Sequence, residues 1–179
     1  MRRQWWLYGR RPNGLIKSYQ RSNIVINSAA SADATLNPSV DMNNAYVLYL
    51  GHTTDDAGTT MPVTTVRIQL IDTKTVRATN GLASGSQIAN YEVVEFWPGV
   101  IKSVQRGNIV VGGATSAIVN INPVDITRTS LLFLGYTSNA TVNNQHHVRL
   151  TLTDSITVTV TVGASGSSST VEYEVVEWY

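Results

Sequence analysis

The residues that could carry chemistry in this sequence are few, and their spacing does not match a catalytic site. Of the three histidines, His146 and His147 are adjacent, and His52 stands near Asp55 and Asp56. A metal site needs several convergent ligands, whereas neighbouring residues of a strand point to opposite faces. We therefore interpret the histidines as exposed loop residues, and we expect no metal site and no cofactor.

The carboxylates are better explained by turns than by hydrolysis. Asp41 and Asp125 occupy matching places in the two halves of the chain, as do Asp72 and Asp154. Asp at such positions hydrogen-bonds its local backbone and stabilises a turn. The sequence has no nucleophile elbow, P-loop or dinucleotide fingerprint, and it offers no convincing carboxylate pair for a glycan-active enzyme. We expect no enzymatic activity.

Basic and acidic side chains recur in two segments that each occur twice. The basic residues lie four apart, on one face of an extended segment, and the acidic ones close each half. They are Lys17, Arg21, Lys102 and Arg106, and Glu92, Glu95, Glu174 and Glu177. If the first and last strands of each half are neighbours, these residues form cross-strand ion pairs worth roughly 0.2–1 kcal/mol each. The alternative is a basic stripe for nucleic acid, which the accompanying acids disfavour.

These segments belong to a repeat that covers nearly the whole chain. The phrase GLIKSYQRSNIV at 14–25 returns as GVIKSVQRGNIV at 99–110, and YEVVEF at 91–96 returns as YEVVEW at 173–178. The openings are offset by 85 residues (14 to 99) and the closings by 82 (91 to 173). A repeat of that length indicates a duplicated domain, since solenoid repeats are shorter.

Composition and patterning predict the all-β class. Charged residues are only 14% of the chain, hydrophobic residues are 42%, and Val, Ile and Thr are abundant, which favours strands. No stretch has a helical period over three turns, and short apolar runs alternate with Gly and Pro turns. We predict two tandem duplicated small β-sandwich or jelly-roll-like domains, at 14–96 and 100–179, joined by a short linker at 97–99.

Each repeat is expected to contain six strands. The first, at 15–26, is expected to break near Ser22, and a short second one is expected at 34–37. The segment at 45–50, matched by 130–134, is nearly all apolar. We predict it to be central and buried, with Tyr49, Leu50, Phe133 and Leu134 in the core. Alternating runs on either side of Asp72 and of Asp154 predict a hairpin in each half.

An N-terminal arm at 1–13 differs from the repeats. Six basic residues and no acid occur through residue 21, and three aromatics are close together. Aromatic residues and Arg are enriched in interface hot spots. We predict that the arm binds a partner through Arg2, Arg3, Trp5, Trp6, Tyr8, Arg10 and Arg11. The alternative is that the arm covers the first domain, in place of the closing strand of a preceding domain.

Membrane insertion, disorder and disulfides are not expected. The chain has no cysteine, and no apolar run approaches the roughly 20 residues of a membrane helix. A net charge of +1 and the hydrophobic content disfavour disorder. Because the N-terminus lacks a signal-peptide core, we expect a soluble protein that begins at its natural Met1 and has no membrane partner.

The combination of GxIKSxQRGxI, an LxLG strand, VRL before a turn and a closing YEVVEF resembles small β-domains of tailed-bacteriophage virion proteins. The resemblance covers about 14–96 and 99–179, and its motifs are fold signatures. The first repeat departs at Tyr19 and Ser22, where the second has Val104 and Gly107.

The resemblance implies a non-enzymatic structural protein of the virion, present in several copies or as a homo-oligomer. Its partners would be other capsid or tail subunits, with nucleic acid not expected. Capsid decoration is the first expectation. The alternative is a tail or baseplate component that binds the host surface or a glycan.

Overall fold

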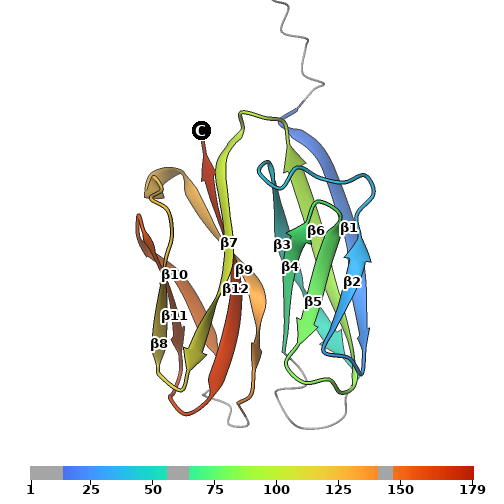
Figure 1. Ribbon diagram of the computed structural model, residues 1–179, viewed down its shortest axis with the longest axis vertical. Helices are drawn as coiled ribbons and strands as arrows, with labels where there is room; N and C mark the ends of the chain where they lie inside the picture. The colour runs from blue at the N-terminus through green and yellow to red at the C-terminus, as the bar shows by residue number, and fades with distance from the viewer. Residues whose placement is uncertain (1–13, 56–64, 141–146) are drawn as a thin grey trace, which may run out of the picture.

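The computed structural model describes residues 14–55, 65–140 and 147–179, and it is all-β (Figure 1). The strands of the first half are β1 Ile16–Asn27, β2 Ser31–Thr35, β3 Ala45–Thr54, β4 Val66–Asp72, β5 Thr75–Asn80 and β6 Ser86–Phe96. Those of the second half are β7 Ile101–Gly112, β8 Ser116–Asn120, β9 Thr129–Ser138, β10 Val148–Asp154, β11 Thr157–Val162 and β12 Ser168–Trp178. A short 3-10 helix, η2, covers Ile126–Arg128.

The two halves pair their strands in the same order. The sheets are β1-β6-β3, β10-β11-β8 and a six-stranded sheet of order β2-β5-β4-β9-β12-β7. In each half, therefore, the first and third strands flank the sixth, and the second and fourth flank the fifth. The six-stranded sheet passes from one half to the other where β4 meets β9, at Arg67 and Gly135. The halves stand side by side with their strands roughly along the long axis (Figure 1).

The alternation of larger apolar residues with other residues explains why β5 and β11 each bury one face. In β5 and β11 every second side chain is buried, as expected where one face of a strand packs on a core. The predicted hairpins are present. The Asp72 carboxylate accepts a hydrogen bond from the Lys74 N–H at 2.7 Å, and the Asp154 carboxylate accepts one from the Ile156 N–H at 2.8 Å. These local bonds fix the β4–β5 and β10–β11 turns.

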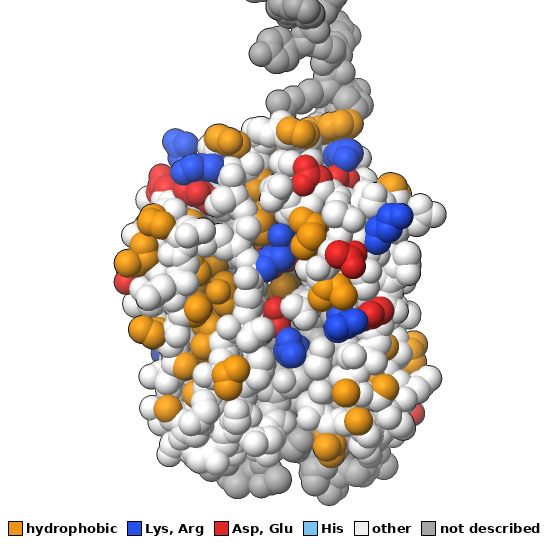
Figure 2. All heavy atoms as spheres, in the orientation of Figure 1, with side chains coloured by type: hydrophobic (Ala, Val, Ile, Leu, Met, Phe, Trp, Pro, Cys, Tyr) orange, Lys and Arg blue, Asp and Glu red, His pale blue; other side chains and the backbone are white. Residues whose placement is uncertain are grey.

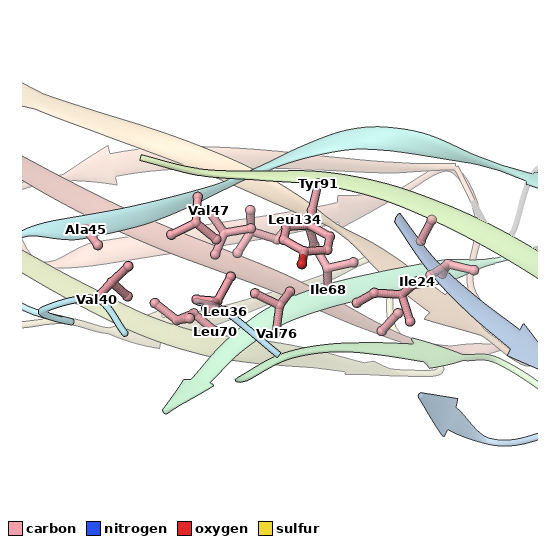
Figure 3. Close-up of a cluster of buried hydrophobic side chains, with 14 of the residues drawn as sticks. Ile24, Leu36, Val40, Ala45, Val47, Ile68, Leu70, Val76, Tyr91 and Leu134 are labelled. Atoms are coloured by element: carbon pink, nitrogen blue, oxygen red, sulfur yellow. The ribbon is translucent and has the colours of Figure 1, made fainter. Parts of the chain in front are cut away.

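Each half has its own buried apolar cluster, and the first cluster also receives residues from the second half: Leu134, with partly buried Leu132 packed against it. Leu134 of β9 is 1% exposed and packs among first-half side chains that include Val47, Ile68 and Tyr91 (Figure 3). It can do so because β9 extends the β2-β5-β4 sheet. The second cluster contains Val111, Val160 and Val175, each fully buried. The halves therefore share core material as well as a surface.

The prediction that segment 45–50 is central is wrong. β3 lies at the edge of its three-stranded sheet, because the closing strand β6 pairs with both β1 and β3 and takes the middle place. Leu50 and Phe133, predicted to be core, are 49% and 41% exposed, whereas the prediction for Leu134 is confirmed. The apolar run has another cause: Val47 faces the first core, and Leu48 faces the second half.

Two smaller expectations also differ from the structure. β1 continues unbroken through Ser22, since it pairs with β6 along its length, and β2 begins at Ser31 rather than at 34. The equivalent residues Ile16 and Ile101 occupy different environments, at 50% and 4% exposed. Ile101 is buried where β7 packs against the first half, so identical sequence positions are not structurally equivalent at this junction.

Candidate interaction surface

The seven arm residues predicted to bind a partner lie outside the described residues. Arg2, Arg3, Trp5, Trp6, Tyr8, Arg10 and Arg11 all belong to the segment 1–13, so their role stays a prediction. The structure does describe the residues to which the arm is joined. Leu15, Ile16 and Tyr19 are 58%, 50% and 65% exposed. Three exposed apolar side chains therefore follow the arm closely in the sequence.

The cross-strand ion pairs predicted from the sequence are confirmed. Lys17 Nζ lies 2.7 Å from Glu95 Oε1 across β1 and β6, and Arg21, four residues later in β1, pairs with Glu92, three residues earlier in β6. The second half repeats the arrangement. Lys102 Nζ lies 2.8 Å from Glu177 Oε1, and Arg106 Nε lies 2.8 Å from Glu174 Oε1. These basic residues are therefore held by acids of the neighbouring strand.

The lysine pairs also organise a loop in each half. Glu95 accepts a hydrogen bond from the Asp41 N–H at 2.9 Å, and Glu177 accepts one from the Asp125 N–H at 2.9 Å. Hydrogen bonding, first from Lys102, lowers the pKa of Glu177. Burial would raise the pKa of Glu95, but hydrogen bonds from Lys17, the Asp41 backbone and Ser18 outweigh it and lower the pKa. Both carboxylates are thus stabilised in their charged form.

The two arginine pairs differ in their surroundings. The Arg21 side chain is 63% exposed, and that of Arg106 is 20% exposed. Arg106 and Glu174 face the first half, where Arg106 Nη2 donates to the Ala45 carbonyl at 2.6 Å and Glu174 Oε2 accepts from the Val47 N–H at 2.9 Å. The second pair thereby binds the backbone edge of β3. Burial raises the pKa of Glu174, and Arg106 opposes that shift.

One buried pair was missed by the sequence analysis. Arg67 Nη1 lies 2.6 Å from Glu172 Oε2, and Gln69 donates to the other carboxylate oxygen at 3.3 Å. Burial raises the pKa of Glu172 to about 7, against the opposing charge of Arg67. A signal was present, because Glu172 stands where the first repeat has Asn90. A charge gained in one repeat alone indicates a contact that the other repeat does not make.

Aromatic and aliphatic side chains of both halves also pack together where the two halves meet. The Trp178 ring lies 5.4 Å from that of Phe96 and 6.1 Å from that of Tyr46, both in edge-on geometry. Ile101 and Val176 are buried in the same cluster. Rings at such distances and angles add about 0.5–1.5 kcal/mol per pair beyond the area they bury. Apolar packing and ion pairs together fix the relative position of the halves.

An aromatic-walled cavity of about 310 Å³ opens beside the β4–β9 contact. Its walls come from matching positions of β3 and β9, namely Tyr49, Gly51 and His52, and Phe133, Gly135 and Tyr136, together with Thr65 and Val66. Tyr49 Oη and His52 Nδ1 share a hydrogen bond. Burial raises the pKa of both Tyr49 and Tyr136, so these phenols stay protonated.

The remaining sequence-based assignments have mixed outcomes. Asp41 and Asp125 accept hydrogen bonds from backbone N–H groups two residues later, at 2.9 Å each, which confirms their turn role. His147 is exposed outside any strand, as expected, and His146 lies outside the described residues. The loop assignment of His52 is wrong, because it lies within β3 and stacks on Tyr49.

Within ranges 14–55, 65–140 and 147–179, no group of three or more His, Cys, Asp or Glu is arranged to hold a metal ion. In the same ranges, no helix has the length and apolarity that a membrane span requires. Comparison with known proteins gives no match: no protein-family model matches the chain, and neither a curated sequence nor a solved structure is significantly similar to it.

Proposed function

We propose that this chain is a non-enzymatic structural protein of a tailed-phage virion, where it decorates the capsid by binding other virion subunits. The observation that carries the proposal is the exposure of Leu15, Ile16 and Tyr19, which follow the arm in the sequence. Exposed apolar side chains that directly follow a segment rich in Arg and Trp in the sequence suit a protein–protein contact. The resemblance of the repeats to small β-domains of tailed-bacteriophage virion proteins is the reason for proposing a phage particle.

The charge distribution supports a protein partner over nucleic acid. Lys17, Arg21, Lys102 and Arg106 are each engaged by a glutamate, so they do not form a free basic stripe. On the face seen in Figure 2, Lys and Arg side chains lie beside Asp and Glu side chains (Figure 2). A phosphate backbone is instead recognised by clustered positive charge.

Deletion of residues 1–11 tests the proposal. We expect the truncated protein to fold, with an unchanged strand signal in circular dichroism, but to lose most of its occupancy on particles assembled in its presence. A matched control keeps the arm and its arginines and replaces Trp5, Trp6 and Tyr8 by Ser, which separates aromatic contacts from charge. Wild-type occupancy of the deletion variant would contradict the docking role of the arm. Micrographs of labelled particles would locate the protein on the head or elsewhere.

The aromatic-walled cavity favours a second candidate function, a tail or baseplate component that binds a host-surface glycan. Its volume of about 310 Å³ lies at the lower end of the range for small-ligand sites. Phe133 is 41% exposed, so its ring is available to stack on a sugar. This candidate predicts binding of a purified host-surface saccharide that Phe133→Ala abolishes while Ile118→Ala leaves it unchanged. Absence of binding would leave capsid decoration as the proposal.

A further inference from the structure

One four-residue motif occurs in each half, and both copies line the same cavity. The motif reads YLGH at 49–52 in β3 and FLGY at 133–136 in β9. Its first and last residues carry rings, and in both copies these residues and the glycine belong to the wall of the cavity of about 310 Å³ beside the β4–β9 contact. The duplication therefore brings two rings from each half to one cavity.

A β-bulge in each strand explains why both rings of a motif reach the same cavity. In a regular strand, residues three apart point to opposite faces of the sheet. Over 49–52, β3 advances three residues while its partner β6 advances two, from 91 to 89. Over 133–136, β9 likewise advances three residues against two of β12, from 173 to 171. Such bulges re-aim side chains and are common beside active sites.

The rings of each motif lie next to each other and can be reached from solvent. The His52 ring stacks on that of Tyr49, with 6.2 Å between centroids and 20° between planes. The Phe133 and Tyr136 rings lie 6.3 Å apart at 38°. Phe133 is 41% exposed, so a ligand can contact its ring. Because the face of an aromatic ring is partly negative, it attracts a cation within about 6 Å.

Polar side chains of the cavity wall are bonded within the protein. Tyr49 Oη shares a hydrogen bond with His52 Nδ1, and Thr65 Oγ1 accepts one from the Ser138 N–H at 3.1 Å. Among the described residues of the wall, none is Lys, Arg, Asp or Glu. Hydroxyl groups lose free energy when they leave water without new hydrogen bonds. This wall therefore suits a ligand whose buried part needs no hydrogen bond.

We propose that the cavity binds a trimethylammonium group, the head group of choline and of related quaternary amines. This group is positively charged and has no N–H to satisfy, and proteins recognise it with aromatic rings. An apolar cavity of about 150 Å³ holds a benzene ring. A cavity of about 310 Å³ therefore has room for the head group and part of its chain. The inference rests on the cavity of the second candidate function and names the chemical group that enters it.

Calorimetric titration of the full chain with choline is the first test, with dimethylbutanol, its neutral isostere, as the comparison. The two compounds share a shape and differ in charge. We expect choline to bind at least about tenfold more tightly, which corresponds to about 1.4 kcal/mol. Sodium chloride at equal concentration controls for ionic strength. Equal affinities would mean that the cavity recognises apolar shape alone and would overturn the proposal, as would the absence of saturable choline binding at millimolar concentration.

Phe133→Leu removes a ring from the wall and keeps an apolar side chain. It should weaken choline binding at least about tenfold and leave dimethylbutanol binding nearly unchanged, because only the cation depends on the ring face. Ile118→Ala is the matched control, since Ile118 is 66% exposed on β8, outside the cavity wall. It should change neither affinity. An equal loss of both ligands in Phe133→Leu would indicate a collapsed cavity and would contradict the proposal.

Vesicles distinguish the possible sources of the group. Co-sedimentation with phosphatidylcholine vesicles, but not with phosphatidylglycerol vesicles, would assign it to a lipid, whereas binding of free choline alone would assign it to a soluble or polymer-attached amine. Both results support the site. A host-surface saccharide that binds where choline does not would overturn this inference and leave the second candidate function standing. Deletion of the arm tests capsid decoration separately, so the proposals can fail independently.

Discussion

The backbone N–H of Val47 in β3 donates a hydrogen bond to the Glu174 carboxylate in β12, 2.9 Å away and 127 residues later in the chain. Arg106 holds the other carboxylate oxygen and donates to the Ala45 carbonyl. Backbone N–H and C=O groups of β3 that do not hydrogen-bond to β6 are thereby paired with side chains of the second half. A buried backbone donor without a partner would be costly.

Arg106→Ala should destabilise the fold strongly, because it leaves the buried Glu174 charge without its partner. Breaking such a pair typically costs about 3–5 kcal/mol. The equivalent change Arg21→Ala removes a solvent-exposed pair and should cost about 0–1 kcal/mol. Urea denaturation of the two variants measures the difference. Equal losses would show that contact with β3 adds nothing to the second pair.

Leu134→Ala should cost about 2–5 kcal/mol, as expected for removal of a buried side chain from a packed core. Leu50→Ala, at the matching position of the first repeat, should cost well under half as much because Leu50 is 49% exposed. Thermal melts of the two variants provide the comparison. A wild-type melting temperature for Leu134→Ala would mean that β9 does not complete the first core.

Gly135→Ala and Gly51→Ala separate backbone strain from close packing. Both glycines have positive φ, so each substitution carries a left-handed conformational cost of about 1–2 kcal/mol. Only at Gly135 would the new Cβ also strike the Val66 carbonyl, at 2.2 Å. We therefore expect Gly135→Ala to be clearly more destabilising in denaturant titrations and to loosen the β4–β9 contact in hydrogen exchange. Indistinguishable stabilities would argue against that contact.

Stability should depend on pH through Glu172. Burial raises the pKa of Glu172 in the folded protein to about 7, above the ordinary value of 4.5. The folded state then binds the proton more tightly than the unfolded state. The stability that protonated Glu172 contributes is therefore fully present below pH 4.5 and is lost as the pH rises through 7. The loss is roughly 3 kcal/mol.

Glu172→Gln provides the control, because Gln cannot ionise. The stability difference between wild type and variant, followed by urea unfolding at intervals from pH 4 to 8, should fall across this window and then level off. Glu95 and Glu177 act in the opposite sense, since their lowered pKa values contribute stability that is lost as pH falls below 4.5. They contribute equally to both proteins. A difference that is flat with pH would show that Glu172 does not titrate in this range.

Local sequence was enough to predict most of the strands, the two hairpins and the ion pairs between the first and last strands of each half. Alternating apolar residues define strands such as β5, because side chains of a strand point alternately to its two faces. Asp72 and Asp154 mark turns, because a short carboxylate reaches its own backbone. The pairing of Lys17 with Glu95 followed once the first and last phrases were taken as neighbours, since the repeat brings opposite charges into one register.

Only the tertiary structure decided which copy of each repeated residue is buried. Leu50 and Leu134 have the same sequence context, as do Arg21 and Arg106, yet one of each pair is exposed and the other is enclosed. The difference arises because Leu134 and Arg106 lie where the second half meets the first, Leu134 in the first core and Arg106 on the Ala45 carbonyl. Leu50 and Arg21 remain exposed. Burial at that junction depends on which surfaces of the two halves meet, and no pattern within a single repeat specifies that choice.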